Sequence, residues 1–276
     1  MNELRTALKV NALFSGISGI ILILLNQQIA KIFGTENNTI FWVIGLTLVF
    51  FAITIIVEIV KQRSLAILWI IIQDFIWVIG SIFLLVSNIL PITPTGLIII
   101  GIVALIVLFM GLNQAKALAK IDNNPEKKGK QWRFERIVKA DKKRTWKLIS
   151  DVGNYALFAP NIDEVKIISG AGIGMVRTCS HGKDTWAETC TLWTDKKEYA
   201  YVVHTTDPDY PYPFKFLNGF WSVEEVDKTT TKIVMRFEFQ YNKKIQNIFL
   251  HPLFRTKFFK VAEELLDNWK KELERK

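Results

Sequence analysis

Four long apolar runs dominate the first part of the chain. They cover Ala7–Leu25, Ile40–Val60, Leu65–Val86 and Gly96–Gly111. Because roughly 20 apolar residues are needed to cross the hydrocarbon core of a bilayer, this pattern predicts four transmembrane helices. The first run lacks the small-residue cleavage site of a signal peptide and three further runs follow it, so we interpret it as a span.

The pattern changes at Gln131, where short segments with strand-like alternation begin. The predicted strands are residues 131–140, Glu164–Ser169, Gly174–His181, Asp184–Trp193, Glu198–Thr205, Phe216–Val226 and Thr230–Tyr241. A helix capped by Asp141 is expected to reach about Val152, a short helical stretch ends at Pro160, and a long amphipathic helix starts near Pro252. Since the strand connections are short, we expect an antiparallel sheet.

The fold class is therefore membrane all-α followed by α+β. We expect a four-span transmembrane domain over residues 1–113, a helical extension and linker over 114–130, and a soluble domain over 131–276. In the soluble domain a curved seven-stranded antiparallel sheet is expected to wrap around the long C-terminal helix.

Charge supports this division and predicts the topology. Residues 1–113 hold five Lys or Arg against four acids, whereas residues 114–276 hold 30 against 22. The basic residues of the short loops gather on one side of the four spans, namely Arg5, Lys9, Lys61, Arg63 and the lysines at 116, 120, 127, 128 and 130, whereas the two loops on the other side hold only Lys31. The positive-inside rule then places both termini and the soluble domain in the cytoplasm, at the inner membrane of a bacterial-type cell. An anionic leaflet is a simpler partner for this charge than nucleic acid.

Asp74 is the one acid in the middle of a predicted span. A carboxylate at this depth is costly, so it marks a functional site unless neighbouring polar groups satisfy it. The structural alternative is that Asp74 is protonated, or that Gln73, Asn11 or a serine of another span donates to it. Ser15 and Gly19 also form a small-xxx-small pair, which is typical of closely packed membrane helices.

The soluble half resembles a known superfamily. The resemblance is carried by DKKRTWKLISDVGNYALFAPNIDEVKIISGAGIGMVRTCSHG, by DTWAETCTLW and by PYPF, with an aromatic-proline turn at Phe158 and Pro160 and glycines at 170, 172 and 174. These features are similar to those of the helix-grip superfamily, which includes START lipid-transfer domains, the birch-pollen allergen family and polyketide cyclase/dehydrase-like proteins. The resemblance covers Gln131 to Arg275 and implies a pocket for a hydrophobic ligand. We identify no matching family for the four spans.

The central hairpin can be aligned residue by residue. If Gly182 and Lys183 form a two-residue turn, Arg177 faces Glu188, Cys179 faces Trp186 and Met175 faces Cys190. We expect Arg177 and Glu188 to form a buried pair that either holds the polar head of a ligand or satisfies itself as a structural salt bridge. Cys179 and Cys190 lie too far apart along the ladder for a disulfide.

Aromatic residues of the later strands complete the candidate site. The predicted ligand-binding residues are Arg177, Trp186, Glu188, Trp221, Met235, Phe237 and Phe239. In the last strand Ile233, Met235, Phe237, Phe239 and Tyr241 alternate toward the interior, whereas Val234 and Glu238 belong to the set expected mostly to face water. The apolar loop Ile245–Phe254 either dips into the membrane through Phe249, Leu250 and Phe254 or packs beneath the long helix.

No nucleophile elbow, phosphate loop or metal-ligand cluster is evident, so we expect neither cofactor nor metal. The leading hypothesis is a membrane-anchored protein that binds a lipid or other hydrophobic small molecule. One alternative is a cyclase- or dehydratase-like enzyme that uses His204 with Tyr199 or Tyr201, or Glu188, in the cavity. Another is a non-catalytic protein-interaction domain at the membrane.

Overall fold

The computed structural model describes residues 2–87 and 89–275, without the side chain of residue 2. It divides into two compact units. The first comprises Met1–Ile121 with Asn247–Leu253, and the second comprises Asp122–Gln246 with Phe254–Lys276.

The helical unit contains the four expected long helices and one short one. The long helices are α1 (Asn2–Leu24), α3 (Thr39–Lys61), α4 (Ser64–Ser87) and α5 (Pro94–Leu118), and the short one is α2 (Asn26–Phe33). The four long helices are long and apolar enough to cross a membrane. The start of α5 follows from its sequence, because the Thr93 side chain accepts a hydrogen bond from the Gly96 N–H and Pro94 occupies the first turn. The more polar α2 escaped prediction because it lacks a long apolar run.

Two glycines set the crossing of α1 and α3. A Cβ atom added to Gly19 would lie 2.7 Å from the Gly45 carbonyl oxygen, and one added to Gly45 would lie 2.7 Å from the Gly19 carbonyl oxygen. Any larger side chain would therefore push the two backbones apart. The small-residue signal at Gly19 corresponds to this close approach.

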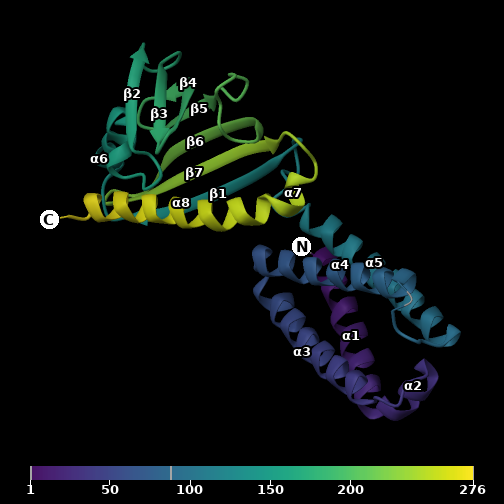
Figure 1. The fold of residues 1–276 in the computed structure, drawn as a ribbon. Helices are drawn as coiled ribbons and strands as arrows, with labels where there is room; N and C mark the ends of the chain where they lie inside the picture. Colours follow the sequence, from purple (N-terminus) through teal and green to yellow (C-terminus); the bar gives the residue numbers. More distant parts are fainter. Residues whose placement is uncertain (1, 88, 276) are drawn as a thin grey trace. The chain divides into compact units, whose positions relative to one another are not determined.

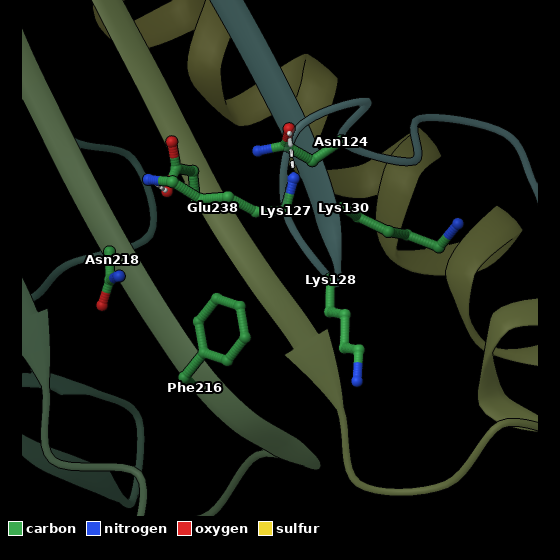
Figure 2. A pocket seen from close by; sticks show the side chains of 7 residues that line it. All are labelled: Asn124, Lys127, Lys128, Lys130, Phe216, Asn218 and Glu238. Atoms are coloured by element: carbon green, nitrogen blue, oxygen red, sulfur yellow. Dashed lines mark hydrogen bonds and ion pairs between the residues drawn. The ribbon is translucent and has the colours of Figure 1, made fainter.

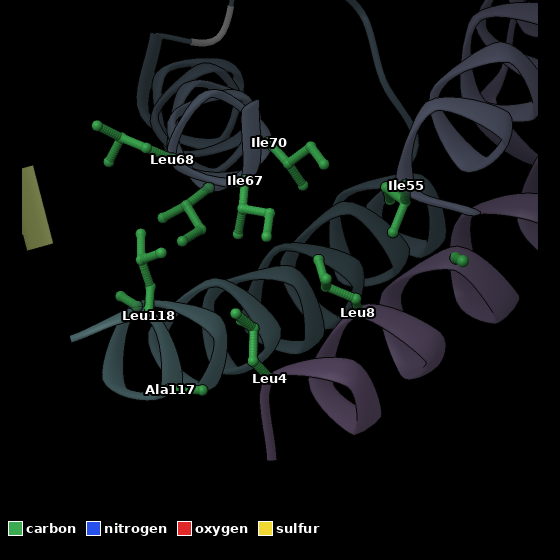
Figure 3. Packing of buried hydrophobic residues seen from close by; sticks show 11 residues of the cluster. Leu4, Leu8, Ile55, Ile67, Leu68, Ile70, Ala117 and Leu118 are labelled. Carbon is green, nitrogen blue, oxygen red and sulfur yellow. The ribbon is translucent and has the colours of Figure 1, made fainter. Parts of the chain in front are cut away.

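An apolar cluster joins α1, α3, α4 and α5 (Figure 3). Its buried members are Leu4, Leu8, Ala12, Ile55, Ile67, Leu68, Ile70, Ile71, Ala115, Ala117 and Leu118. Ile248, from the Asn247–Leu253 segment of the same unit, packs against this cluster.

The second unit is a seven-stranded antiparallel sheet with a long helix along it (Figure 1). The strands are β1 (Lys130–Val138), β2 (Glu164–Ser169), β3 (Val176–His181), β4 (Asp184–Thr194), β5 (Glu198–Val203), β6 (Phe214–Asp227) and β7 (Thr230–Tyr241). Their spatial order is β1-β7-β6-β5-β4-β3-β2, so every pair except β1–β7 joins neighbours in sequence. Both the strand number and the antiparallel arrangement were predicted.

The helices of this unit are α6 (Lys142–Ile149), the 3₁₀ helix η1 (Val152–Leu157) and most of α8 (His251–Leu273). The one-turn α7 (Gln246–Phe249), apart from its first residue, and the first three residues of α8 belong to the helical unit. Asp141 caps α6 as expected, since its carboxylate accepts from the Arg144 N–H at 2.9 Å. The predicted extension of α6 to Val152 was wrong, because the chain turns at Ser150 and continues as a 3₁₀ helix. The apolar face of α8 is buried through Ala262, Leu265, Leu266, Trp269 and Leu273.

Candidate functional site

The central hairpin β3–β4 has the predicted register. Arg177 lies opposite Glu188 and Cys179 opposite Trp186, and Gly182 adopts the positive φ of +58° that the tight turn requires. Cys190 pairs through its backbone with Met175 at 2.8 Å. Both cysteines are free and buried, and burial raises the pKa of the Cys179 thiol, so this thiol is a poor nucleophile.

Arg177 and Glu188 form a buried ion pair on the concave face. The Arg177 Nε and Nη2 groups donate to one carboxylate oxygen of Glu188 at 2.9 and 2.7 Å. The other carboxylate oxygen accepts from the Trp186 indole N–H at 2.8 Å. The guanidinium also lies 3.9 Å from the ring centroid of Tyr201 and donates to the Val152 carbonyl at 3.4 Å. Because each charge already has partners within the protein, this geometry favours a structural salt bridge over a site that binds the polar head of a ligand.

Aromatic rings pack closely over the rest of the concave face. Trp221 stacks on Tyr199 at a centroid distance of 5.1 Å and meets the edge of Phe237 at 5.5 Å. Trp132 lies 4.4 Å from Phe239. We expected some of these side chains to line a void, and the structure shows that several of their rings contact one another directly.

Two buried polar atoms next to these rings have no hydrogen-bond partner among the described residues. They are the indole N–H of Trp221, whose contact with the Tyr155 hydroxyl falls short of regular hydrogen-bond geometry, and the hydroxyl of Tyr210. Trp221 is only 5% exposed, so its N–H is also shielded from bulk water. A buried donor left without an acceptor costs free energy that a suitable ligand atom would recover.

Tyr210 and Tyr212 were not predicted as site residues. They belong to the segment between β5 and β6, in which Tyr210 contacts Tyr212 at 5.8 Å and Tyr212 contacts Trp186 at 5.7 Å between ring centroids. Burial and the nearby Glu188 charge both raise the pKa of Tyr210. The sequence DYPYP was the available signal, because two tyrosines among prolines form a stiff aromatic loop.

The remaining predicted site residues of the sheet domain are buried or half-buried. Met235 and Phe239 are fully buried in β7, and Phe237 and Trp186 are half-buried. Phe254 packs on the sheet against Phe214 at 5.6 Å.

The apolar segment before α8 has a mixed environment. Phe249 is 45% exposed and Leu250 is half-buried. The segment therefore contains both exposed and packed apolar side chains, and its contact with a membrane stays a prediction.

Two residues expected on the solvent side of β7 are buried. Val234 is 4% exposed and Glu238 is 6% exposed. The side chain of Lys127, from the loop that precedes β1, donates to Glu238 at 3.2 Å. Alternation alone missed this burial, because it does not show which loop covers the outer face of a sheet.

Asp74 is held by neutral donors from two other helices. Asn11 of α1 and Gln114 of α5 donate to the same carboxylate oxygen at 2.7 and 2.8 Å. Ser15 donates to the Asn11 side-chain oxygen at 3.0 Å, which completes a buried chain of polar groups. Asn11 was an expected partner and Gln114 was not, whereas Gln73 bonds the Trp69 carbonyl of its own helix.

His204 faces away from the concave side. Its Nε2 atom lies 2.7 Å from the Thr189 hydroxyl, and its Nδ1 atom lies 3.6 Å from the Asp207 carboxylate. The tyrosines considered as its partners are used elsewhere, since Tyr199 donates to the Ile149 carbonyl and Tyr201 to the Met175 sulfur. The geometry thus does not assemble the dyad proposed for a cyclase-like reaction.

Residues 132–274 match the family described as polyketide cyclase/dehydrase and lipid transport. This match covers more than half of the chain, which therefore belongs to that family. The description joins polyketide chemistry with lipid transport, which agrees with a domain for hydrophobic small molecules. The helix-grip resemblance of the soluble half is confirmed.

Solved structures are similar to the sheet domain at low sequence identity. The protein XoxI from Bacillus cereus is 17% identical, with 52% of this chain and 94% of that chain covered and a TM-score of 0.42. The Zhui aromatase/cyclase from Streptomyces sp. R1128 is 14% identical, with 53% and 96% covered and a TM-score of 0.43. A norcoclaurine synthase from Thalictrum flavum, a point mutant in complex with a transition-state analogue, is 17% identical, with 52% and 93% covered and a TM-score of 0.42. No curated protein matches the chain.

Proposed function

We propose that this protein is anchored in a membrane by α1, α3, α4 and α5 and binds a lipid or other hydrophobic small molecule on the concave face of its soluble domain. The distribution of lysines supports a cytoplasmic position for that domain. The anchor keeps the binding face within reach of ligands that partition into the bilayer.

The buried indole N–H of Trp221, which makes no regular hydrogen bond and meets only the Tyr155 hydroxyl, is the observation that supports this proposal. It is buried among the rings of Tyr155, Tyr199 and Phe237, which are suitable contacts for an apolar ligand. The ligand should place an acceptor oxygen, such as that of a ketone, ester or carboxyl group, on this N–H. The Tyr210–Tyr212 segment, which touches Trp186, is the part of the wall that moves aside for entry.

Native mass spectrometry of the full chain in detergent, followed by solvent extraction, tests this function. We expect a co-purifying hydrophobic molecule with at least one acceptor oxygen. Trp221→Phe removes the donor and should weaken the affinity for that molecule about five- to tenfold, the value of one hydrogen bond. Trp193→Phe is the matched control, because Trp193 stacks on Tyr199 at 5.6 Å but is not one of the unpaired donors.

The proposal fails if the purified protein is empty and takes up nothing from added phosphatidylcholine vesicles. It also fails if both tryptophan variants bind the extracted molecule as well as the natural chain does. A bound molecule whose affinity depends only on Trp193 would place the site elsewhere in the domain.

A further inference from the structure

The β1 edge of the sheet is covered by the chain itself. The loop before the strand folds back along it, since Asn123 forms a bridge with Lys130 and the Gln131 N–H donates at 2.8 Å to a carbonyl of the same loop. Figure 2 shows Asn124 of this loop beside β1, where the loop lines a pocket of about 330 Å³ together with residues of β6 and β7. Backbone groups that would otherwise face outward from β1 are therefore satisfied.

The β2 edge, at the other end of the sheet, has no such cover (Figure 1). No backbone hydrogen bond joins residues 164–169 to any described residue outside β3. Five of the six side chains of β2 are exposed, including Ile167 at 44% and Ile168 at 60%. Leu157 and Ile173, which flank the strand in sequence, are also exposed. An edge with free backbone groups and exposed apolar side chains is a template for pairing with another strand.

The neighbouring hairpin determines which backbone groups of β2 point outward. Because the β3–β4 turn has two residues, His181 bonds to β4 through its backbone, and so does every second residue before it. The residues between them, Thr178 and Ser180, bond instead to the β2 residues that lie opposite them. By the same alternation, the N–H and C=O groups of Val165 and Ile167 point away from β3 toward the free edge.

We propose that β2 pairs in antiparallel orientation with β2 of a second copy of this chain, across a two-fold axis at Val165. The N–H of each Val165 then donates to the carbonyl of the other, and Glu164 of each copy lies opposite Lys166 of the other. Within one copy these two exposed side chains already lie 2.8 Å apart. The pairing adds a matching ion pair on each side and forms a square of alternating charges. This self-complementary charge pattern identifies a second copy as the strand that the edge fits.

Other two-fold registers are disfavoured. An axis at Glu164 or at Lys166 would place like charges directly opposite each other, which is destabilising. An axis at Ile167 would draw the pairing onto Ile168, where the register between β2 and β3 shifts. An axis at Val165 keeps the new ladder within the regular part of the strand.

Disulfide trapping in the full chain, purified in a non-ionic detergent, tests the position of the axis. The Cα atoms of a hydrogen-bonded antiparallel pair lie about 5.5 Å apart, which a disulfide can span. Val165→Cys should therefore give a covalent dimer on mild oxidation. Ile167→Cys should not, because its two copies are offset by about 14 Å along the strands. The natural chain is the control, since Cys179 and Cys190 are buried.

Charge reversal tests the register. Sedimentation of the full chain in the same detergent should show a dimer, and Glu164→Lys or Lys166→Glu should weaken it about tenfold, because the two-fold axis places like charges opposite each other twice. The double variant with both reversals restores opposite charges across the axis and should dimerise as the natural chain does. Lys228→Glu is the control, because it makes the same change of charge in the exposed turn between β6 and β7.

Three results would overturn the proposal. They are a monomeric natural chain, a dimer that the double variant fails to restore, and trapping of Ile167→Cys in place of Val165→Cys. The proposed hydrophobic site uses none of these residues, so Trp221→Phe should leave the dimer unchanged. Failure of ligand binding and failure of strand pairing are therefore distinguishable.

Discussion

Each of the two units buries a carboxylate, and they satisfy it by different chemistry. In the helical unit Asp74 accepts hydrogen bonds from the neutral amides of Asn11 and Gln114. In the sheet domain Glu188 accepts from the charged guanidinium of Arg177 and from Trp186. The helical site joins three helices, whereas the sheet site joins two neighbouring strands and the rings above them.

The comparison shows what each unit can supply. Long apolar helices present few cations, so an internal carboxylate is matched by amide donors that add no second charge. A strand pair places residues directly opposite each other, so a full counter-charge can be set beside Glu188 at the cost of desolvating both ions. Neither carboxylate is therefore free to act as a catalytic base without first losing its partners.

The largest expected effect is the loss of the sheet pair. Arg177→Met leaves Glu188 buried without a counter-charge and should lower the free energy of unfolding by about 3–5 kcal/mol. The double variant with Glu188→Leu removes both charges and should recover most of this loss. Urea unfolding of the full chain in detergent, followed by near-ultraviolet circular dichroism, measures both. Equal losses of stability in the single and double variants would show that the cost does not come from leaving Glu188 without its counter-charge.

Lys130 offers a second test, because its ammonium group is buried. Burial lowers its pKa from 10.5 to about 8, and the Asp122 charge partly opposes this. Between pH 8 and 10.5 the unfolded chain binds the proton that the folded chain has released, so stability should rise with pH. The total rise is on the order of 3 kcal/mol.

Lys130→Met should remove this rise and make the domain more stable at neutral pH. Urea unfolding at a series of pH values measures the slope. The exposed Lys139 provides the control, because Lys139→Met should keep the slope of the natural chain. A natural chain without any rise in this window would contradict the expected penalty at Lys130.

A smaller effect is expected in the helical unit. Asp74→Leu leaves the amides of Asn11 and Gln114 without their acceptor and should cost about 2 kcal/mol. Asp74→Asn keeps a carbonyl oxygen in place and should cost less. Thermal unfolding of the full chain in detergent, followed by far-ultraviolet circular dichroism, compares them. If both variants unfold together with the natural chain, the polar cluster does not hold the helices, and a functional role for Asp74 becomes the better reading.

Alternation and turn chemistry were sufficient for much of the candidate site. The two-residue turn at Gly182 and Lys183 determines the pairing of Arg177 with Glu188, because a hairpin of known loop length has one register. The inward set of β7 followed from period-two alternation. Of the two partners of Asp74, the sequence predicted Asn11 but not Gln114, because the apolar pattern of a span does not show which helices it packs against.

Local sequence therefore determined the four apolar helices, the seven strands and the facing pairs of the hairpin, because each depends on neighbours in the chain or across one tight turn. Tertiary structure decided that the guanidinium is already satisfied, that the indole N–H of Trp221 makes no regular hydrogen bond, that the loop before β1 covers Glu238, and that His204 faces outward. These outcomes depend on how distant segments fill and cover a shared space. The alternating pattern of a single strand holds no information on that packing.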